Sequence, residues 1–414
     1  MNHDRSISPE FINQLRNDFW QFGNLAWLIA IADRTLNSFA DGILSATDIA
    51  QLFTIGLLAV CWVFLNPSPT DEEALYKVLR TFIPSVPEVA VPPARELIQK
   101  YGYQQSSLWR GWKIHHAVMP NARSQVPIIL VHGFGGSIGH WRQNISELAK
   151  HHSVYTIDLL GFGASDKPDI AYSIDLWVEQ LHEFWQTFIG TPVILVGNSI
   201  GSLTCLATAA EYPDMVRGVA MISLPDTTSH EAAIPVRLRP LVGWLQAVFV
   251  SPIVLYPLFH ILRYPAITRR WASIAYACRE AVTDELLEIL TKPTREQGSA
   301  QAFCAILKGM ISPQFSPSVQ SILTRIKVPS LLLWGKHDRM IPAASAQQFL
   351  SYNSALQLIE LDDAGHCAHD ECPERVNAEL IEWIQTQVLQ HDRSRSVWGD
   401  RAAKLSQIQE TMQR

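Results

Sequence analysis

Ser199 is the central residue of the pentapeptide GNSIG, residues 197–201, which directly follows the apolar run 192–196. A buried strand followed by G-x-S-x-G is the pattern of a nucleophile elbow, a tight turn that presents a serine hydroxyl to a substrate. Gly197 and Gly201 are expected because the turn leaves no room for side chains there. The pentapeptide can arise by chance, so a base, an acid and an oxyanion-stabilising loop must be found elsewhere.

A serine hydroxyl is a poor nucleophile at neutral pH unless a histidine takes its proton during attack. His366 directly follows the predicted strand 356–361 and the residues DDAG. Loops at the carboxyl ends of strands are where an α/β sheet gathers its site residues. We therefore predict His366 as the base. His369 is the nearest alternative, and we expect it instead to support this loop through a hydrogen bond.

The base needs a carboxylate that fixes its tautomer and stabilises the imidazolium. Asp338 follows the predicted strand 331–334 in the sequence WGKHD and is the predicted acid. Asp226, after the run 219–223, is the alternative acid, or else a turn residue at the start of the next segment. The predicted set of Ser199, Asp338 and His366 needs neither a metal nor an organic cofactor.

The glycine-rich sequence HGFGG, residues 132–136, follows another predicted strand. Backbone amides must stabilise the oxyanion that forms on acyl attack, and we expect the amides of Phe134 and Ile200 to do so. The loop lacks the Lys-Ser/Thr of a phosphate-binding loop. A second glycine-rich turn at 161–166 is expected to be scaffold. Cys367 and Cys372 have no second pair of metal ligands, so zinc is disfavoured.

Short apolar runs bounded by turn residues predict strands at 111–118, 128–131, 154–158, 193–197, 219–223, 331–334 and 356–361. Helical patterns separate most of them, at about 142–150, 172–189, 201–212, 343–351 and 373–390. The alternation predicts an α/β fold with a mostly parallel, doubly wound sheet covered on both faces. The connection between the predicted strands 219–223 and 331–334 is far longer than a βα connection needs, which predicts an inserted segment.

These patterns divide the chain into five parts. We expect an N-terminal apolar helical extension with a Pro-rich linker, a first part of the core, a helical cap insertion, a second part of the core and a polar C-terminal tail. Their expected bounds are 1–102, 103–224, 225–328, 329–390 and 391–414.

Two apolar segments could contact a membrane. Residues 49–65 form an uncharged run of 17, which is at the lower limit for a transmembrane helix and could equally form a helical hairpin packed on the body. Residues 241–262 form an uncharged run of 22 in which Pro252 and Pro257 argue against one straight span. We expect this cap segment to line a hydrophobic tunnel and touch a membrane, with ordinary helical core as the alternative.

Composition narrows the classes of partner. The chain has 33 Lys and Arg against 39 Asp and Glu, a net charge of −6, which gives nucleic-acid binding little support. The six cysteines are scattered without a C-x-x-C pair and are interpreted as free thiols in a reducing compartment. The first 18 residues are polar and give no sign of a cleavable signal peptide. We therefore expect an intracellular, membrane-associated protein that is not secreted; the oligomeric state stays open.

Taken together, the motifs resemble the α/β-hydrolase superfamily over roughly residues 103–390. The resemblance is carried by HGFGG at 132–136, DLLGFGASD at 158–166, GNSIG at 197–201, WGKHD at 334–338 and AGH at 364–366. Relatives that are dehalogenases or epoxide hydrolases carry Asp at the nucleophile position, so Ser199 disfavours those reactions. The resemblance implies a serine hydrolase.

A closer resemblance is to the pheophytinase and chlorophyll dephytylase branch. It is carried by SIDLW at 173–177, AVTDEL at 281–286 and GHCAHDE at 365–371. This likeness implies a carboxylic-ester hydrolase acting on a long hydrophobic ester, such as the phytyl ester of a chlorophyll-type pigment, at a thylakoid or plasma membrane. The alternatives are a lipase, thioesterase, carbon–carbon hydrolase or acyltransferase on the same triad, or a non-catalytic ligand-binding homologue.

Overall fold

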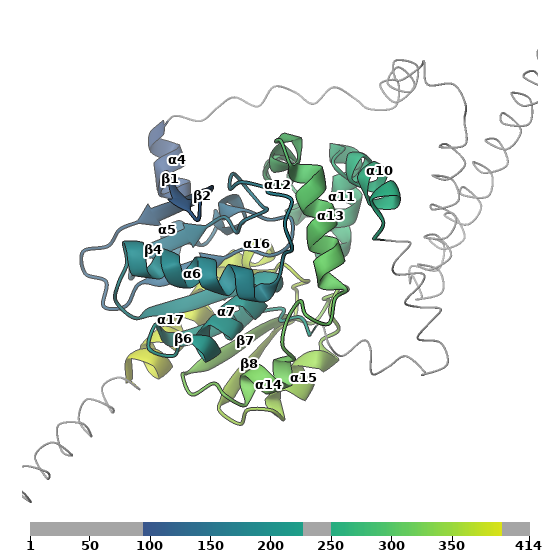
Figure 1. Cartoon of the computed structure of the whole chain (residues 1–414). Coiled ribbons are helices and arrows are strands. Elements are labelled where there is room, and N and C mark those ends of the chain that lie inside the picture. The colour runs from purple at the N-terminus through teal and green to yellow at the C-terminus, as the bar shows by residue number, and fades with distance from the viewer. Residues whose placement is uncertain (1–93, 227–249, 391–414) are drawn as a thin grey trace, which may run out of the picture. The chain divides into compact units, whose positions relative to one another are not determined.

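The computed structural model describes residues 94–226 and 250–390 (Figure 1). The chain divides into a unit of residues 1–88 and a unit of residues 89–414, and every described residue belongs to the second. Three expectations therefore lie outside the described residues: the membrane contact at 49–65, most of the N-terminal extension and the C-terminal tail. Residues 241–249 of the predicted cap segment 241–262 also lie outside them.

An eight-stranded sheet forms the centre of the fold, in the order β1-β2-β4-β3-β5-β6-β7-β8. The strands are β1 (Tyr103–Trp109), β2 (Trp112–Met119), β3 (Ile128–Val131), β4 (Val154–Ile157), β5 (Val193–Asn198), β6 (Val216–Ile222), β7 (Ser330–Gly335) and β8 (Leu356–Leu361). Strands β1 and β2 pair antiparallel with each other, β2 pairs antiparallel with β4, and all other pairs are parallel. The predicted α/β class with a mostly parallel sheet is confirmed.

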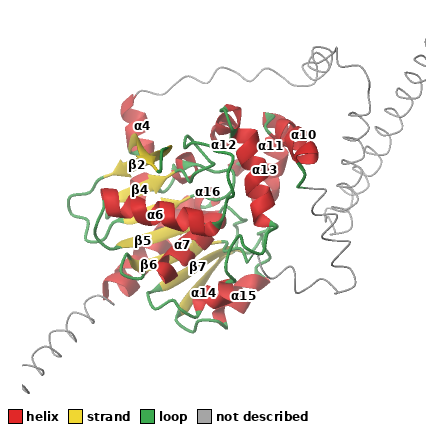
Figure 2. Ribbon diagram, viewed as in Figure 1, coloured by secondary structure: helices red, strands yellow, loops and turns green. Residues whose placement is uncertain are grey.

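Helices cover both faces of the sheet, as Figure 2 shows. They are α4 (Ala94–Tyr101), η1 (Ile138–Trp141), α5 (Ile145–Leu148), α6 (Ile174–Phe188), α7 (Ile200–Glu211), α14 (Val319–Leu323), α15 (Ala344–Leu350), α16 (Ala368–Glu371), α17 (Pro373–Trp383) and η4 (Ile384–Val388). Successive strand residues point to opposite faces. Leu195 accordingly packs in the cluster that contains α6 and α7, whereas Val196 packs in the cluster that contains α17.

The connection from β6 to β7 is helical. Its described elements before α14 are α10 (Pro252–Leu262), α11 (Pro265–Ala275), η2 (Arg279–Ala281), α12 (Asp284–Thr291), η3 (Lys292–Arg295) and α13 (Ser299–Met310). We call α10–α13 the cap helices; they lie together beside the body (Figure 1). Pro252 begins α10, where a missing N–H costs little, and Pro257 lies inside it. Across residues 94–226 and 250–390, no helix has the length and apolarity needed to cross a membrane.

Two local features differ from what the sequence indicated. Of the helix expected at 142–150, the structure has the four-residue α5, and the side chain of Asn144 before it donates to Asn377 Oδ1 and to the His369 carbonyl oxygen across the fold. Strand β1 was not predicted, because its sequence YQQSSLW is polar and mostly exposed. It pairs only with β2, so it needs no apolar face to hold it in the sheet.

Candidate active site

Ser199 lies at a strained turn between β5 and α7. Its backbone has φ 54° and ψ −122°, a conformation that a residue with a side chain rarely adopts and that costs about 1–3 kcal/mol. A Cβ built on Gly197 would overlap the backbone of Gly201, which confirms that this turn has no room for a side chain. The Ser199 N–H donates to the Ile222 carbonyl oxygen at 2.9 Å, so strand β6 holds the turn in place.

His366 and Asp338 are joined by a hydrogen bond between Nδ1 and Oδ2 of 2.9 Å. Both side chains are buried. The other carboxylate oxygen of Asp338 accepts from the backbone N–H groups of Met340 and Ile341, each at 2.9 Å. An imidazole that donates through Nδ1 presents Nε2 as its proton acceptor, which is the arrangement a general base requires.

The environment of Asp338 keeps its carboxyl ionised. Burial by itself would raise its pKa, but the hydrogen bond from His366, the charge of His366 and the amide of Ile341 outweigh it and hold the pKa of Asp338 below its usual value. An ionised partner stabilises the imidazolium that forms when His366 takes a proton. Asp338, rather than the alternative Asp226, is the carboxylate at Nδ1 of His366.

The loop that carries His366 is held from three sides. The Asn198 side chain donates to the His366 carbonyl oxygen at 3.0 Å, and the His366 N–H donates to Ala275 of the cap at 2.7 Å. One carboxylate oxygen of Glu371 accepts from the Gly365 N–H at 2.7 Å, and the other accepts from the Cys278 N–H at 2.5 Å. Sequence reasoning missed Asn198 and Glu371. Asn198 is the first variable position of G-x-S-x-G, and Glu371 is the last residue of GHCAHDE. Their place inside these two motifs was the one sequence signal that could have pointed to them.

The glycine-rich loop at 132–136 packs directly on the elbow. A Cβ on Gly133 would lie 2.8 Å from Asn198 Oδ1 and 3.2 Å from Ser199 Cβ. His132 braces the loop: its Nε2 accepts from the Leu159 N–H at 3.1 Å, and its Nδ1 donates to the Gly133 carbonyl oxygen at 2.8 Å. Burial lowers the pKa of His132, which suits a neutral ring with one donor and one acceptor nitrogen.

The two predicted oxyanion donors occupy suitable elements. Ile200 is the first residue of α7, where the N–H groups have no carbonyl partner inside the helix. Phe134 lies in the turn closed by the hydrogen bond from Gly136 to Gly133, 3.1 Å long. Asp158 supports this region, because its carboxylate accepts from Ile138 and Ala164, both at 2.7 Å. Oxyanion binding by Phe134 and Ile200 stays a prediction.

The expectation for His369 was wrong. Its two ring nitrogens are buried and have no hydrogen-bond partner in the described part of the chain. The ring instead packs against Trp141 and His140, with centroids 4.2 and 4.5 Å away. Burial, and then the neighbouring His140, holds the pKa of His369 well below its usual value, so the ring is neutral. Packing has replaced the expected hydrogen bond, and Glu371 supports the loop.

Aromatic side chains connect the glycine-rich loop to the cap. The Phe134 ring lies 5.7 Å from Phe162 of the body and 6.0 Å from Phe303 of α13. Phe303 in turn lies 5.2 Å from Phe259 of α10. These rings place apolar surface beside the predicted oxyanion donor Phe134.

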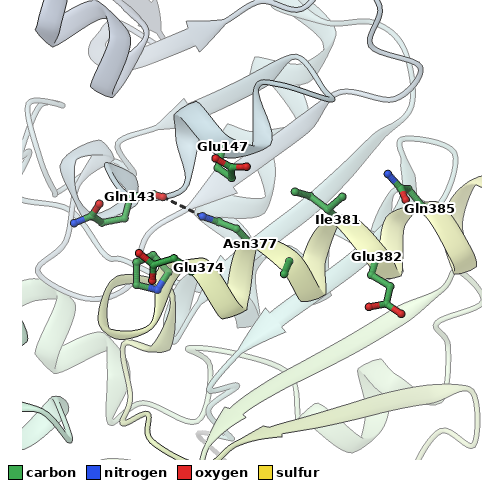
Figure 3. Close-up of a pocket in the computed structure, with 9 residues that line it drawn as sticks. Gln143, Glu147, Glu374, Asn377, Ile381, Glu382 and Gln385 are labelled. Atoms are coloured by element: carbon green, nitrogen blue, oxygen red, sulfur yellow. Dashed lines mark hydrogen bonds between the residues drawn. The ribbon is translucent and has the colours of Figure 1, made fainter.

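A groove of about 580 Å³ lies between α5 and α17 (Figure 3). The Asn377 side chain donates to the Gln143 carbonyl oxygen across it at 3.1 Å. Its walls include three glutamates and none of Ser199, Asp338 or His366; the lining residues are Gln143, Glu147, Pro373, Glu374, Asn377, Ala378, Ile381, Glu382 and Gln385. This groove is therefore separate from the candidate active site.

The chain is similar to several known proteins. Protein ABHD8 of Bos taurus is 27% identical over 64% of this chain and 57% of its own length. Chloroplastic pheophytinase of Arabidopsis thaliana is 25% identical over 62% of this chain and 61% of its own length. The solved structure of a membrane phospholipase A, a bacterial virulence factor, shares the fold with a TM-score of 0.57 at 20% identity, over 81% of this chain and 98% of that one.

The match thus spans less than two thirds of the length of both curated relatives. The sequence model of the alpha/beta hydrolase family matches residues 128–379, which is more than half of the chain and contains Ser199, Asp338 and His366. The strand order, the elbow and this match agree, and the chain belongs to the α/β-hydrolase family.

Proposed function

We propose that this protein is a serine carboxylic-ester hydrolase that works through an acyl-enzyme. The observation that carries the proposal is the 2.9 Å hydrogen bond from His366 to a buried, ionised Asp338, next to an elbow that holds Ser199 in a strained turn. Strain of this kind persists only where the surroundings enforce it, and it is typical of sites with a function. It weighs against a non-catalytic homologue.

The reaction has two halves. Ser199 Oγ bonds to the ester carbonyl carbon while His366 Nε2 takes the hydroxyl proton, and the amides of Phe134 and Ile200 bind the oxyanion. The bond to the alcohol oxygen then breaks as His366 returns the proton to the leaving alcohol. Water attacks the acyl-enzyme with His366 as base, and release of the acid restores Ser199.

The substrate class is a long hydrophobic ester. The rings of Phe134, Phe303 and Phe259 offer apolar surface next to the oxyanion loop. Sequence motifs shared with the pheophytinase branch, and the 25% identity to chloroplastic pheophytinase, favour the phytyl ester of a chlorophyll-type pigment. Such substrates dissolve in membranes, so an intracellular, membrane-associated location is part of the proposal. A lipase, thioesterase, carbon–carbon hydrolase or acyltransferase would use the same three side chains.

The test is hydrolysis of detergent-dispersed pheophytin a, chlorophyll a, a triacylglycerol and a short p-nitrophenyl ester, with products separated by chromatography. Wild type is compared with Ser199→Ala and with the control Ser351→Ala. Ser351 is an exposed serine at the C-terminal end of α15. Release of phytol by wild type and Ser351→Ala, but not by Ser199→Ala, is the expected result. Cleavage of the short ester alone would keep the serine esterase and discard the pigment. Full activity of Ser199→Ala on these substrates would overturn the proposal.

A further inference from the structure

Large apolar side chains are exposed along two successive cap helices. Ile253 and Ile261 of α10 are 74% and 42% exposed, and Trp271 and Ile274 of α11 are 56% and 38% exposed. The members of each pair are eight and three residues apart, so each pair lies on one side of its helix. We call these four side chains the α10–α11 face. Helices α10 and α11 are consecutive and contact each other, and exposed apolar side chains on neighbouring elements mark an interaction site more often than scattered ones do.

The opposite side of α10 is buried. Leu255 and Phe259, four residues apart, are the buried residues of this helix, and Phe259 contacts Phe303 at 5.2 Å between centroids. Phe303 lies next to Phe134 of the oxyanion loop. Helix α10 therefore has one apolar side against the rings that lead to the candidate active site and a second apolar side toward the outside.

The charge of this region differs from that of the whole chain. The chain has a net charge of −6, yet residues 232–279 contain six arginines and no Asp, Glu or Lys; the arginines are Arg237, Arg239, Arg263, Arg269, Arg270 and Arg279. Arg237 and Arg239 lie outside the described residues, and Arg269 pairs with Asp284 of α12. A stretch that combines exposed Trp and Ile with arginine and lacks carboxylates has the composition of helices that lie in the interface of anionic membranes.

We propose that the α10–α11 face docks onto an anionic lipid bilayer. The apolar side chains enter the boundary between headgroups and acyl chains, and arginines of the described cap, such as Arg263 at the end of α10 and Arg279 in η2, attract the lipid phosphates. Docking there places α10 between the bilayer and the aromatic rings beside the oxyanion loop. Docking itself does not depend on catalysis. It rests on the proposed function only in that the membrane would supply the hydrophobic ester.

The experiment measures cosedimentation of the full-length protein with vesicles of phosphatidylcholine alone or mixed with phosphatidylglycerol. We compare wild type, the double variant Ile253→Ser/Trp271→Ser, and Leu108→Ser as a matched control, since Leu108 is 78% exposed on the β1 side of the body. The anionic vesicles are expected to bind wild type and Leu108→Ser, and to bind the double variant at least about tenfold more weakly, because two apolar anchors are lost. Raising the salt concentration should weaken binding by wild type.

A second measurement tests whether Trp271 itself enters the bilayer. Lipids brominated on their acyl chains quench tryptophans that enter the bilayer. Quenching of wild type minus that of Trp271→Phe should show a distinct Trp271 contribution, while Trp271→Phe still sediments with vesicles. Equal sedimentation of the double variant and wild type, or no Trp271 contribution, would assign lipid binding to another segment and overturn the proposal. A change in oligomeric mass of the double variant by light scattering, with vesicle binding unchanged, would show a contact between copies instead.

Hydrolysis of a soluble p-nitrophenyl ester is measured on the same variants. Wild type and the double variant should have the same turnover, because Ile253 and Trp271 lie outside the candidate active site. Vesicle binding without any ester hydrolysis would contradict the proposed function and leave docking standing. If the ester is hydrolysed but the double variant binds vesicles as well as wild type does, the docking proposal is contradicted and the proposed function stands.

Discussion

Helices α7 and α10 are both rich in apolar residues, yet they use them in opposite ways. Ten of the 12 residues of α7 are buried, because the helix packs on β5 and β6 beneath the elbow. Only Leu255 and Phe259 of the 11 residues of α10 are buried. An apolar helix therefore supports Ser199 in one region and leaves an apolar surface exposed in the other. An apolar run predicts burial only when enough other elements surround it.

The difference has an energetic consequence. Leu203 and Leu206 of α7 are fully buried, and each contributes roughly 1.5–3 kcal/mol by leaving water. Exposed residues of α10 contribute little to the stability of the isolated protein. We therefore expect the body to be the stable platform for the triad, and the cap helices to be the part that opens first.

The largest expected effect lies in the body. Ser199→Ala should lower kcat by about 10⁴-fold or more while leaving the fold intact, because it removes the nucleophile without altering the packing of α7. Initial rates on the p-nitrophenyl ester, together with circular dichroism, measure both quantities. Ile253→Ala in the cap is the matched control and should keep its rate. Activity retained by Ser199→Ala would place the nucleophile elsewhere.

The second prediction compares the two helices by stability. Leu203→Ala in α7 should lower the free energy of unfolding by about 2–5 kcal/mol, because it leaves a cavity in the core. Ile253→Ala in α10 should change it by less than about 0.5 kcal/mol, because that side chain is 74% exposed. Urea unfolding followed by tryptophan fluorescence measures both. Similar losses in the two variants would show that the α10–α11 face is covered in the protein.

The third prediction concerns the link between the two regions. Glu371 joins Gly365 of the catalytic loop to Cys278 of the cap through its two carboxylate oxygens. Glu371→Gln keeps the shape but replaces one acceptor oxygen with a donor, so kcat should fall roughly tenfold as His366 loses its placement, with KM little changed. Steady-state kinetics on the soluble ester test this split. A change confined to KM would mean that Glu371 shapes the substrate site through the cap instead.

The fourth prediction uses one N-cap from each region. Ser173 caps α6 of the body and Thr283 caps α12 of the cap, each accepting from a backbone N–H at 3.2 Å. Replacement of either by Ala should cost about 1 kcal/mol locally. If the cap opens before the body, Ser173→Ala lowers the global unfolding midpoint, whereas Thr283→Ala mainly speeds proteolysis within the cap. Equal shifts of the midpoint would show that cap and body unfold together.

The smallest effect is a dependence on pH. The folded-state pKa of Asp338 lies below the ordinary aspartate value of 3.8, so its carboxylate stabilises the fold fully above that value. This stabilisation is lost as the pH falls from 3.8 through the lower folded-state pKa. Acid unfolding of wild type and Asp338→Asn, from pH 6 to pH 2, should therefore converge toward the acid end. A constant difference across the range would contradict a lowered pKa for Asp338.

The sequence was most informative where local geometry restricts the residue type. Gly197 and Gly201 are required by the elbow, and each motif follows a buried parallel strand, so strand order alone brought Ser199, Asp338 and His366 to one edge of the sheet. Contacts between distant positions were not accessible in this way. Asn198 and His366 are 168 residues apart, and no pattern indicated their hydrogen bond. His369 was misjudged for the same reason, because its ring packing depends on Trp141 and His140.

Labelling with a fluorophosphonate probe, followed by peptide mass spectrometry, tests the central claim most directly. The probe bonds to a serine oxygen only where a base and an oxyanion site activate it. We predict one adduct, on Ser199, in wild type, no adduct in Ser199→Ala, and labelling slowed by orders of magnitude in His366→Ala. An adduct on another residue, or a rate that does not change in His366→Ala, would contradict the assignment of the triad.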